Sequence, residues 1–305
     1  MRILSIGELL WDVFAEREFL GGAPLNFSVS TKRLGSEVAL VSAIGTDARG
    51  AGAIRTLREL GLDTSFIQTV RDQDTGTAIV KTDASGNARF VIPRPAAFDC
   101  IDVSDAQLAR IVGMSPEWIY FGTLAQTNLK NELLLERLAS ALPEARFFYD
   151  MNFREGHWDL SLVRRLSGLA TIIKLNDAEA ETLFRLTSTS GAFSVEEFCR
   201  YWSSCYPGTV ICVTLGGRGC GIWARGKFRT FSGYSVEVID TVGAGDAFAA
   251  AFLHGYQLGW PTERTAAFAN ALGAIVASRA GATPAWNVEE CIRLIDIAPS
   301  TEPEL

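Results

Sequence analysis

Short runs of apolar residues alternate along this chain with longer stretches in which apolar positions recur at helical spacing. The short runs predict buried strands, and the longer stretches predict helices that cover them. Strands alternating with helices are typical of an α/β fold with a mostly parallel central sheet flanked by helices. We expect strands at residues 2–6, 38–44, 118–121, 147–149, 171–175 and 209–214, and helices at 25–34, 51–60, 131–141, 177–186, 247–258 and 262–279.

One segment departs from this alternation. Residues 75–82 and 88–92 flank a turn at 83–87 that contains Gly and Asn, which predicts a β-hairpin. With the chain before Gly21 it predicts a small β-sheet without helices of its own. We therefore expect a single α/β domain over residues 1–305, with a lid formed by residues 13–21 and 74–98. A second hairpin is predicted over 221–224 and 227–231.

Composition narrows the function classes. The chain has 305 residues, 48% hydrophobic content and a net charge of −7, with no basic block. These values predict a globular protein that binds neither nucleic acid nor a membrane. Six cysteines without a CxxC pair, and only two histidines, argue against a zinc site and are typical of a reducing cytoplasm. The first residues predict a strand rather than a signal peptide, and the polar tail at 299–305 predicts a frayed end.

Polar residues gather where the predicted strands end. In open α/β sheets, ligands bind beyond the carboxyl ends of the strands, so these residues are expected to lie around one site. They are Asp12, Thr123, Asp150, Asn152, Arg154, Lys174, Asn176 and Thr214, with Gly122 and Gly216 beside them.

The segment Asp-Thr-Val-Gly-Ala-Gly-Asp at 240–246 runs directly into an apolar helix. Free amides at a helix N-terminus bind anions, and glycine allows a ligand to approach the backbone closely. Asp246 stands where it could take a proton from a hydroxyl beside that anion. An anion site next to a base is what phosphoryl transfer to an alcohol requires. A tight turn with Asp246 as a helix N-cap is the alternative.

A second glycine-containing segment, Gly21-Gly22-Ala23-Pro24-Leu25-Asn26, lies near the N-terminus. Its two glycines permit close approach of a ligand, and Asn26 offers a donor and an acceptor that suit sugar hydroxyls. The alternative is a loop in which Pro24 merely begins a helix.

Residues 21–45 and 240–253 resemble the N- and C-terminal signatures of the PfkB (ribokinase-like) sugar kinases, in the expected order and more than two hundred residues apart. The segments at 7–12 (Gly-Glu-Leu-Leu-Trp-Asp), 21–26 and 121–125 look most like those of bacterial fructokinases. The resemblance implies a ribokinase-like fold with a β-lid. It also implies transfer of the γ-phosphate of ATP, with Mg²⁺, to a primary hydroxyl of a sugar, D-fructose above all.

The resemblance also assigns roles. It implies Asp246 as general base and the amides of Gly243, Ala244 and Gly245 as the anion hole. It places the sugar near Asp12, Gly22, Asn26, Phe90, Phe98 and Arg154, and the nucleotide near Lys174, Asn176, Thr214, Gly216, Gly219 and Asn270. It implies Mg²⁺ near Glu179 through water, and a monovalent cation, usually K⁺, near Asp240 and Val242.

Plainer interpretations of several of these residues stay open. Asn176 and Glu179 have the spacing of a helix-capping pair. Arg154 could pair with Asp150 instead of contacting a ligand. Phe90 and Phe98 could pack inside the lid, and Asn270 could be a helix-surface amide.

Alternatives also remain for the function. The acceptor could be 2-keto-3-deoxygluconate, tagatose, ribose or a nucleoside, and more remotely the chain could be a non-catalytic sugar-binding regulator. The run at 221–228 misses the P-loop pattern because Phe228 replaces its Ser/Thr, and no intact GxGxxG follows a strand. Unpaired lid edges could join two copies of the chain into a homodimer.

Overall fold

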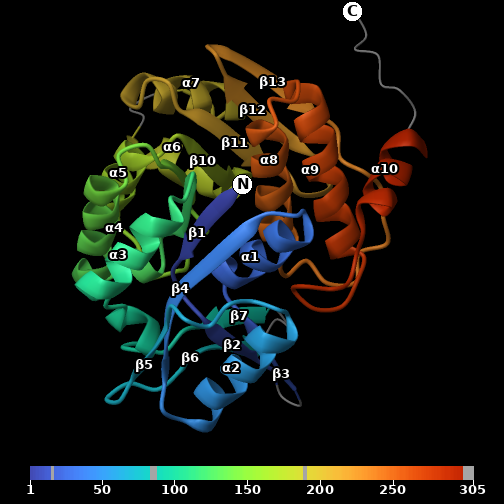
Figure 1. Ribbon diagram of the computed structural model, residues 1–305. Coiled ribbons are helices and arrows are strands. Elements are labelled where there is room, and N and C mark those ends of the chain that lie inside the picture. The colour runs from blue at the N-terminus through green and yellow to red at the C-terminus, as the bar shows by residue number, and fades with distance from the viewer. Residues whose placement is uncertain (15–16, 83–87, 188–190, 298–305) are drawn as a thin grey trace, which may run out of the picture.

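The computed structural model describes residues 1–14, 17–82, 88–187 and 191–297, and the side chains of 80–82 and 88–90 lie outside that description. Within these described residues, nine strands form one central sheet in the order β13-β12-β11-β10-β9-β8-β1-β4-β5 (Figure 1). Its first seven members in sequence pair in parallel, and β12 and β13 pair antiparallel. The strands are β1 (Arg2–Ile6), β4 (Glu37–Gly45), β5 (Ile67–Val70), β8 (Trp118–Gly122), β9 (Arg146–Asp150), β10 (Ile172–Asn176), β11 (Val210–Thr214), β12 (Cys220–Ala224) and β13 (Lys227–Phe231).

Helices cover both faces of this sheet. One face is covered by α3 (Asp105–Met114), α4 (Leu129–Ala141), α5 (Leu160–Leu169), α6 (Asp177–Thr187) and α7 (Val195–Cys205). The other is covered by α1 (Ala23–Arg33), α8 (Ala244–Gln257) and α9 (Thr262–Ala277), with α10 (Val288–Ile297) against α9. Because both faces are buried, the central strands are continuous apolar runs.

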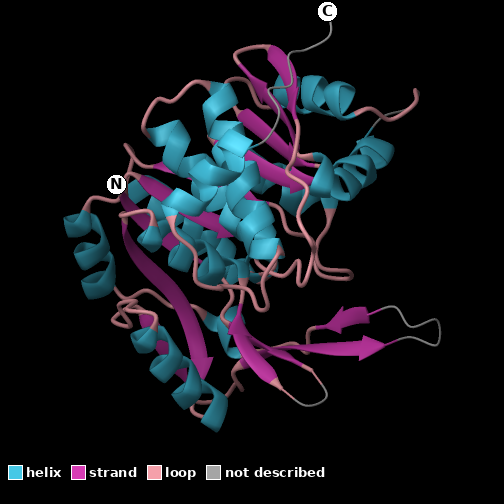
Figure 2. Cartoon of the chain, turned by 90° about the vertical axis from the view of Figure 1, so that its right-hand side faces the viewer, coloured by secondary structure: helices cyan, strands magenta, loops and turns pink. Residues whose placement is uncertain are grey.

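A separate four-stranded sheet has the order β3-β2-β6-β7 and projects from the α/β body (Figure 2). Its strands are β2 (Leu10–Val13), β3 (Glu18–Gly21), β6 (Gly76–Thr82) and β7 (Ala88–Val91). The sheet begins at Leu10, three residues before the predicted lid boundary. It is tied to α2 (Ala48–Glu59) by the indole of Trp11, which donates to the carbonyl of Arg49 at 3.1 Å.

The fold confirms the predicted α/β class, and all six predicted strands and six predicted helices form, with ends shifted by a few residues. Four helices and the short strands β2 and β5 were not predicted. For α3 a signal was present, because Ser104 and Gln107 form a capping box at its start. The predicted turn at 83–87 and the tail at 299–305 lie outside the described residues.

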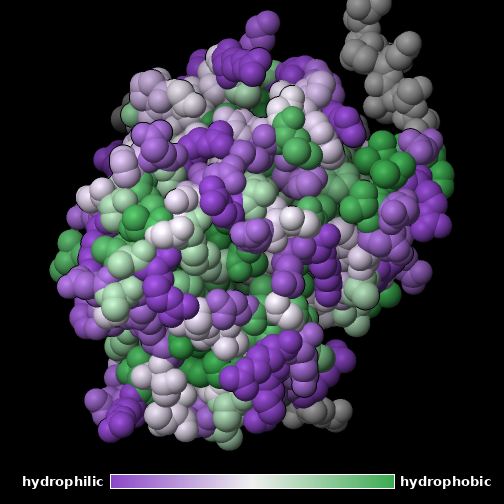
Figure 3. All heavy atoms as spheres, viewed as in Figure 1, coloured by the Kyte–Doolittle hydropathy of each residue, from purple (hydrophilic) through white to green (hydrophobic). Residues whose placement is uncertain are grey.

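The face of the molecule seen in Figure 3 is mostly polar. On the face shown in Figure 3, hydrophilic side chains are spread over the molecule with smaller apolar areas between them. Within the described ranges, no helix combines the length and the apolarity needed to cross a membrane.

Candidate active site

The N-terminus of α8 lies at the carboxyl edge of the sheet, and Gly243 sets its geometry. Gly243 is the N-cap of the helix and has a φ of 79°, in the left-handed region. A Cβ atom at this position would lie 2.1 Å from the carbonyl oxygen of Ala282. Both the dihedral angle and the packing therefore require glycine.

The first amides of α8 lie where the N-terminus of a helix can bind an anion. The amides of Gly245 and Asp246 have no acceptor within the described part of the chain, and they lie at the positive end of the helix dipole. The amide of Ala244 differs from the prediction of a three-amide anion hole, because it donates to the carbonyl of Thr241 at 3.2 Å. Because the turn before α8 places the carbonyl of Thr241 over the end of the helix, the amide of Ala244 is already used.

The carboxyl group of Asp246 is buried, with 8% of the residue exposed. Its Oδ2 accepts a hydrogen bond of 2.8 Å from Nδ2 of Asn26, which lies 220 residues earlier in the chain. Burial raises the pKa of Asp246 to about 6, and the charge of Asp150 adds to the rise, while Lys174 and Asn26 oppose it. A carboxylate with a raised pKa is still ionised at neutral pH and is a stronger base than an exposed one.

Asn26 was predicted to bind a sugar directly, which stays a prediction, and in the structure its side-chain amide donates to Asp246. Its Oδ1 is buried and has no partner among the described residues. Asn26 thus fixes the rotamer of Asp246 and still presents one acceptor. The contact could not be predicted, because it joins the first turns of α1 and α8.

Lys174 and Asp150 form an ion pair behind the helix end. Nζ of Lys174 lies 2.9 Å from both carboxylate oxygens of Asp150, which also accepts from the hydroxyl of Tyr120 at 3.0 Å. Burial alone lowers the pKa of Lys174, but the charges of Asp150 and Asp246 outweigh it and hold the pKa above its ordinary value. A Cβ at Gly245 would lie 3.3 Å from that Nζ, so a fixed positive charge stands beside the free amides.

Arg154 extends from the loop after β9. Its Nη1 donates to Oδ1 of Asn152 at 2.7 Å and to the carbonyl of Phe153 at 3.1 Å. The alternative in which Arg154 pairs with Asp150 does not occur, since Asp150 is held by Lys174. Asn152 has a φ of 43°, which turns this loop back toward the cavity.

Two further carboxyl groups face Arg154 and Asp246. Asp12 lies on β2, and burial raises its pKa to about 6. Glu8 was not predicted as a site residue, although it lies in the segment that resembles fructokinases. It is 4% exposed, and burial raises its pKa to about 7. A further signal in the sequence is that this charged residue stands two positions after a buried strand.

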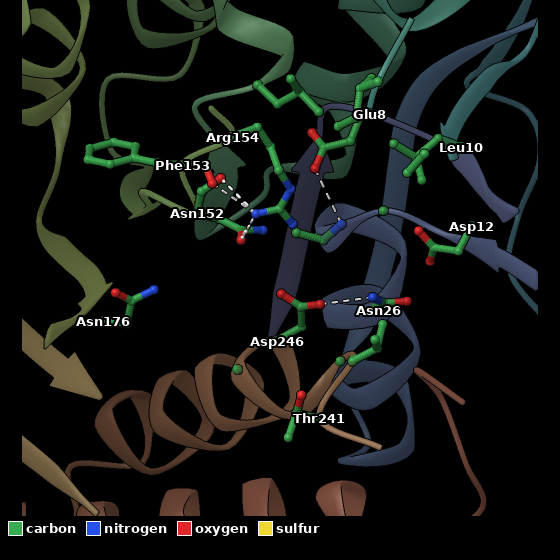
Figure 4. A pocket seen from close by; sticks show the side chains of 18 of the residues that line it. Glu8, Leu10, Asp12, Asn26, Asn152, Phe153, Arg154, Asn176, Thr241 and Asp246 are labelled. Atoms are coloured by element: carbon green, nitrogen blue, oxygen red, sulfur yellow. Dashed lines mark hydrogen bonds between the residues drawn. The ribbon is translucent and has the colours of Figure 1, made fainter. Parts of the chain in front are cut away.

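These groups surround a cavity of about 530 Å³, here called the acid-lined cavity (Figure 4). The body and the small sheet both contribute to its wall. Its lining includes Glu8, Leu10, Asp12, Gly22, Asn26, Ala78, Ile92, Arg154, Lys174, Asn176, Glu179, Gly243 and Asp246.

A second cavity of about 560 Å³, the glycine-lined cavity, adjoins the first. Thr214, Thr241 and Gly245 line both. Gly216, Gly219 and Asn270, which were predicted to lie near the nucleotide, also line the second cavity, together with Tyr234, Val236 and Phe248. Asn270 is not a surface amide, because it is buried and donates to the carbonyl of Ser232 at 3.0 Å. The free amides of α8 lie where the two cavities meet.

Asn176 and Glu179 form the capping pair that their spacing predicts. Oδ1 of Asn176 accepts from the amide of Glu179 at 2.8 Å, and Oε2 of Glu179 accepts from the amide of Asn176 at 2.8 Å. Oε1 of Glu179 accepts from the amide of Phe153, so this carboxylate also fixes the loop that carries Arg154. Both capping residues still line the acid-lined cavity.

Asp240 joins two segments. Its carboxylate accepts from the amides of Val242 at 3.0 Å and Gly281 at 3.1 Å. The carbonyl of Ala277 accepts from the amides of Ile239 and Asp240. These contacts hold the turn before α8 against the end of α9, and the cation site predicted there stays a prediction.

Phe90 and Phe98 were both predicted to lie near the sugar, and the structure describes the side chain of Phe98 alone. Phe98 is fully buried, packs under the lid sheet against Gly76, and does not line the acid-lined cavity. Ala78 and Ile92 supply the apolar wall instead. The side chain of Phe90 lies outside the described residues.

Known proteins are similar to this chain in both sequence and fold. Residues 5–289 match the pfkB family of carbohydrate kinases. The chain belongs to this family. It is 30% identical over 296 residues to fructokinase-1 of Oryza sativa subsp. japonica, covering 91% of this chain and 88% of that protein. It is 29% identical over 267 residues to an aminoimidazole riboside kinase of Salmonella typhimurium, covering 83% and 80%.

The fold of this pfkB kinase is also that of solved relatives. The crystal structure of a fructokinase with bound ATP from Xylella fastidiosa superposes with a TM-score of 0.83 at 25% identity, covering 97% of this chain and 98% of that one. The ribokinase-like fold is therefore established for this chain, with the central parallel sheet and the separate small sheet in place.

Proposed function

We propose that this protein transfers the γ-phosphate of ATP to a primary hydroxyl of a neutral sugar, D-fructose first among the candidates. The observation that carries the proposal is the meeting of two cavities at the N-terminus of α8, with Asp246 on one side and a glycine-rich wall on the other. Similarity to plant fructokinase supports fructose, and similarity to a riboside kinase keeps other acceptors in the test.

In this proposal the sugar occupies the acid-lined cavity and ATP the glycine-lined cavity. Asp246 accepts the proton of the attacking hydroxyl, and Asn26 holds the carboxylate in place. The amides of Gly245 and Asp246, with Lys174 beside them, stabilise the charge on the phosphoryl group as it moves. Such donors lower the barrier by about 3 kcal/mol each in comparable sites.

Mg²⁺ fits the donor set of the site. No cluster of three or more His, Cys, Asp or Glu side chains that could hold a metal occurs in the described ranges. Mg²⁺ is commonly held by substrate phosphates, waters and one or two carboxylates, and Glu179 offers one carboxylate at the cavity wall. Bound there, Mg²⁺ would neutralise phosphate charge.

The proposal includes a monovalent cation beside Asp240 and Val242, because hard cations prefer oxygen ligands and Asp240 supplies a carboxylate. It also includes a homodimer formed through the edges of the lid sheet. Equal turnover in buffers with and without K⁺ and Na⁺ would reject the cation. A single monomeric species in sedimentation, at every concentration tested, would reject the dimer.

The function is tested by measuring ADP release with Mg-ATP and a panel of acceptors: fructose, tagatose, ribose, 2-keto-3-deoxygluconate, adenosine and no acceptor. Preference for fructose is the expected result. Turnover with another acceptor alone would keep the chemistry and change the substrate. Tight sugar binding without any turnover would favour a non-catalytic regulator.

A further inference from the structure

Glu8 lies between β1 and β2, at the junction of the body and the lid sheet. Its Oε1 accepts from the amide of Ala23 at 3.4 Å, and its Oε2 is buried with no hydrogen-bond partner among the described residues. A buried carboxyl oxygen without a hydrogen-bond partner lowers the stability of the folded protein. Packing alone therefore does not explain why a glutamate stands at this position.

The contact with Ala23 is the capping contact of α1. The N-cap of this helix is Gly22, which has no side chain to accept a hydrogen bond, and Pro24 has no amide. A Cβ at Gly22 would lie 2.4 Å from the carbonyl oxygen of Glu8, so the two segments touch through their backbones as well. A carboxylate at a helix N-terminus stabilises the helix best when it is ionised. One turn further on, Asn26 holds Asp246.

Across the cavity, Glu8 faces charged groups from other elements. Arg154 and Asp246 lie around the same pocket as Glu8 (Figure 4). Burial is the largest cause of the rise in the pKa of Glu8, the positive charge of Arg154 lowers this pKa, and the charge of Asp246 raises it. Asp12, Lys174 and Glu179 line the same cavity. Among the described residues, Nε and Nη2 of Arg154 make no hydrogen bond. No ion pair joins Arg154 to Glu8 there, so Arg154 and Glu8 each keep unused hydrogen-bonding capacity.

Resting on the kinase function proposed above, we propose that Glu8 is a positioning residue for acceptor binding. Its ionised carboxylate holds the start of α1 and attracts the guanidinium of Arg154, and this sets the cavity wall against which the sugar lies. When Glu8 is protonated, its interactions with the start of α1 and with Arg154 weaken, and the wall is held less firmly. The affinity for the sugar therefore follows the ionisation of Glu8, while the chemical step follows Asp246.

The experiment measures the KM for the sugar and kcat at saturating Mg-ATP from pH 6 to pH 8.5. Wild type, Glu8→Gln and Asp12→Asn are compared. Glu8→Gln keeps an oxygen for the amide of Ala23 but cannot ionise. Asp12→Asn removes a half-buried carboxylate from the same cavity and leaves Glu8 intact.

For wild type, KM is expected to fall about tenfold over this range, since burial raises the pKa of Glu8 to about 7. In Glu8→Gln that fall disappears, KM stays near the wild-type value at pH 6, and the change in kcat is smaller than the change in KM. In Asp12→Asn the KM is higher throughout but still falls with pH.

An unaltered KM profile in Glu8→Gln would overturn the inference, and so would a profile that flattens only in Asp12→Asn. In both cases wild-type turnover would leave the kinase function standing. Absence of wild-type turnover with every acceptor would overturn the proposed function and this inference with it. Unfolding curves at pH 6 and 8 show whether Glu8→Gln is folded, and Glu8→Asp, which restores an ionisable group, should recover part of the pH dependence.

Discussion

Replacing Asp246 by asparagine is expected to stabilise the folded protein at pH 8 while it greatly slows phosphoryl transfer. The asparagine is isosteric, and its Oδ1 can accept the hydrogen bond that Asn26 donates to Asp246. What the substitution removes is a buried negative charge beside Asp150, and with it the proposed base.

The magnitude follows from the pKa of Asp246, which burial raises from 3.8 to about 6. Because the folded pKa lies above the unfolded one, the favourable contribution of the protonated group is complete below the unfolded pKa. It is lost as the pH rises through about 6. The difference between the two pKa values corresponds to about 3 kcal/mol in the free energy of unfolding. Asp246→Asn should therefore be more stable than wild type by about 3 kcal/mol at pH 8, and by about half as much at pH 5.

The assay is urea unfolding at both pH values, followed by tryptophan fluorescence, because Trp118 and Trp202 are fully buried. The control is Asp102→Asn, which removes an exposed carboxylate and should change stability by less than about 0.5 kcal/mol at either pH. Turnover of Asp246→Asn should fall by about 10²- to 10⁴-fold. A variant less stable than wild type at pH 8, or a gain independent of pH, would refute the electrostatic reasoning. Near-wild-type turnover would refute the assignment of the base.

Gly243→Ala should destabilise the protein more than Gly259→Ala. Both glycines have a positive φ, but only at Gly243 would the new Cβ meet backbone atoms. Equal losses of stability in the two variants would contradict this reasoning. Lys174→Met should cost about 3–5 kcal/mol at pH 8, because it leaves Asp150 buried without its partner charge, and Lys174→Met with Asp150→Asn should recover part of that loss in the same unfolding assay. Removal of Mg²⁺ with EDTA should abolish ADP release and excess Mg²⁺ should restore it; activity that persists in EDTA would exclude a role for the metal.

Local sequence was sufficient for the parallel sheet and for the position of the glycine turn that begins α8. Buried parallel strands are continuous apolar runs, and a glycine turn before an apolar helix describes the start of α8 within a few residues. The same local reasoning missed α3, α5, α7 and α10. It placed the start of the lid three residues late, because β2 is a short strand that follows β1 after only Gly7, Glu8 and Leu9.

The partners of the predicted residues needed the tertiary structure. Asn26 and Asp246 are 220 residues apart, and nothing in either segment indicates that the amide serves the carboxylate. The pairing of Asp150 with Lys174 rather than with Arg154 depends on β9 and β10 being neighbours in register.

The burial of individual side chains, like their contact partners, depends on the tertiary structure. Phe98 and Glu8 each lie in a segment that the sequence connects with the site, yet the aromatic ring packs beneath the lid sheet and the carboxyl lines the cavity. Residue type and local pattern determine which chemistry this chain can perform and roughly where along it. Which groups meet, and how far each pKa moves, depends on contacts between distant segments and on the water that those contacts exclude.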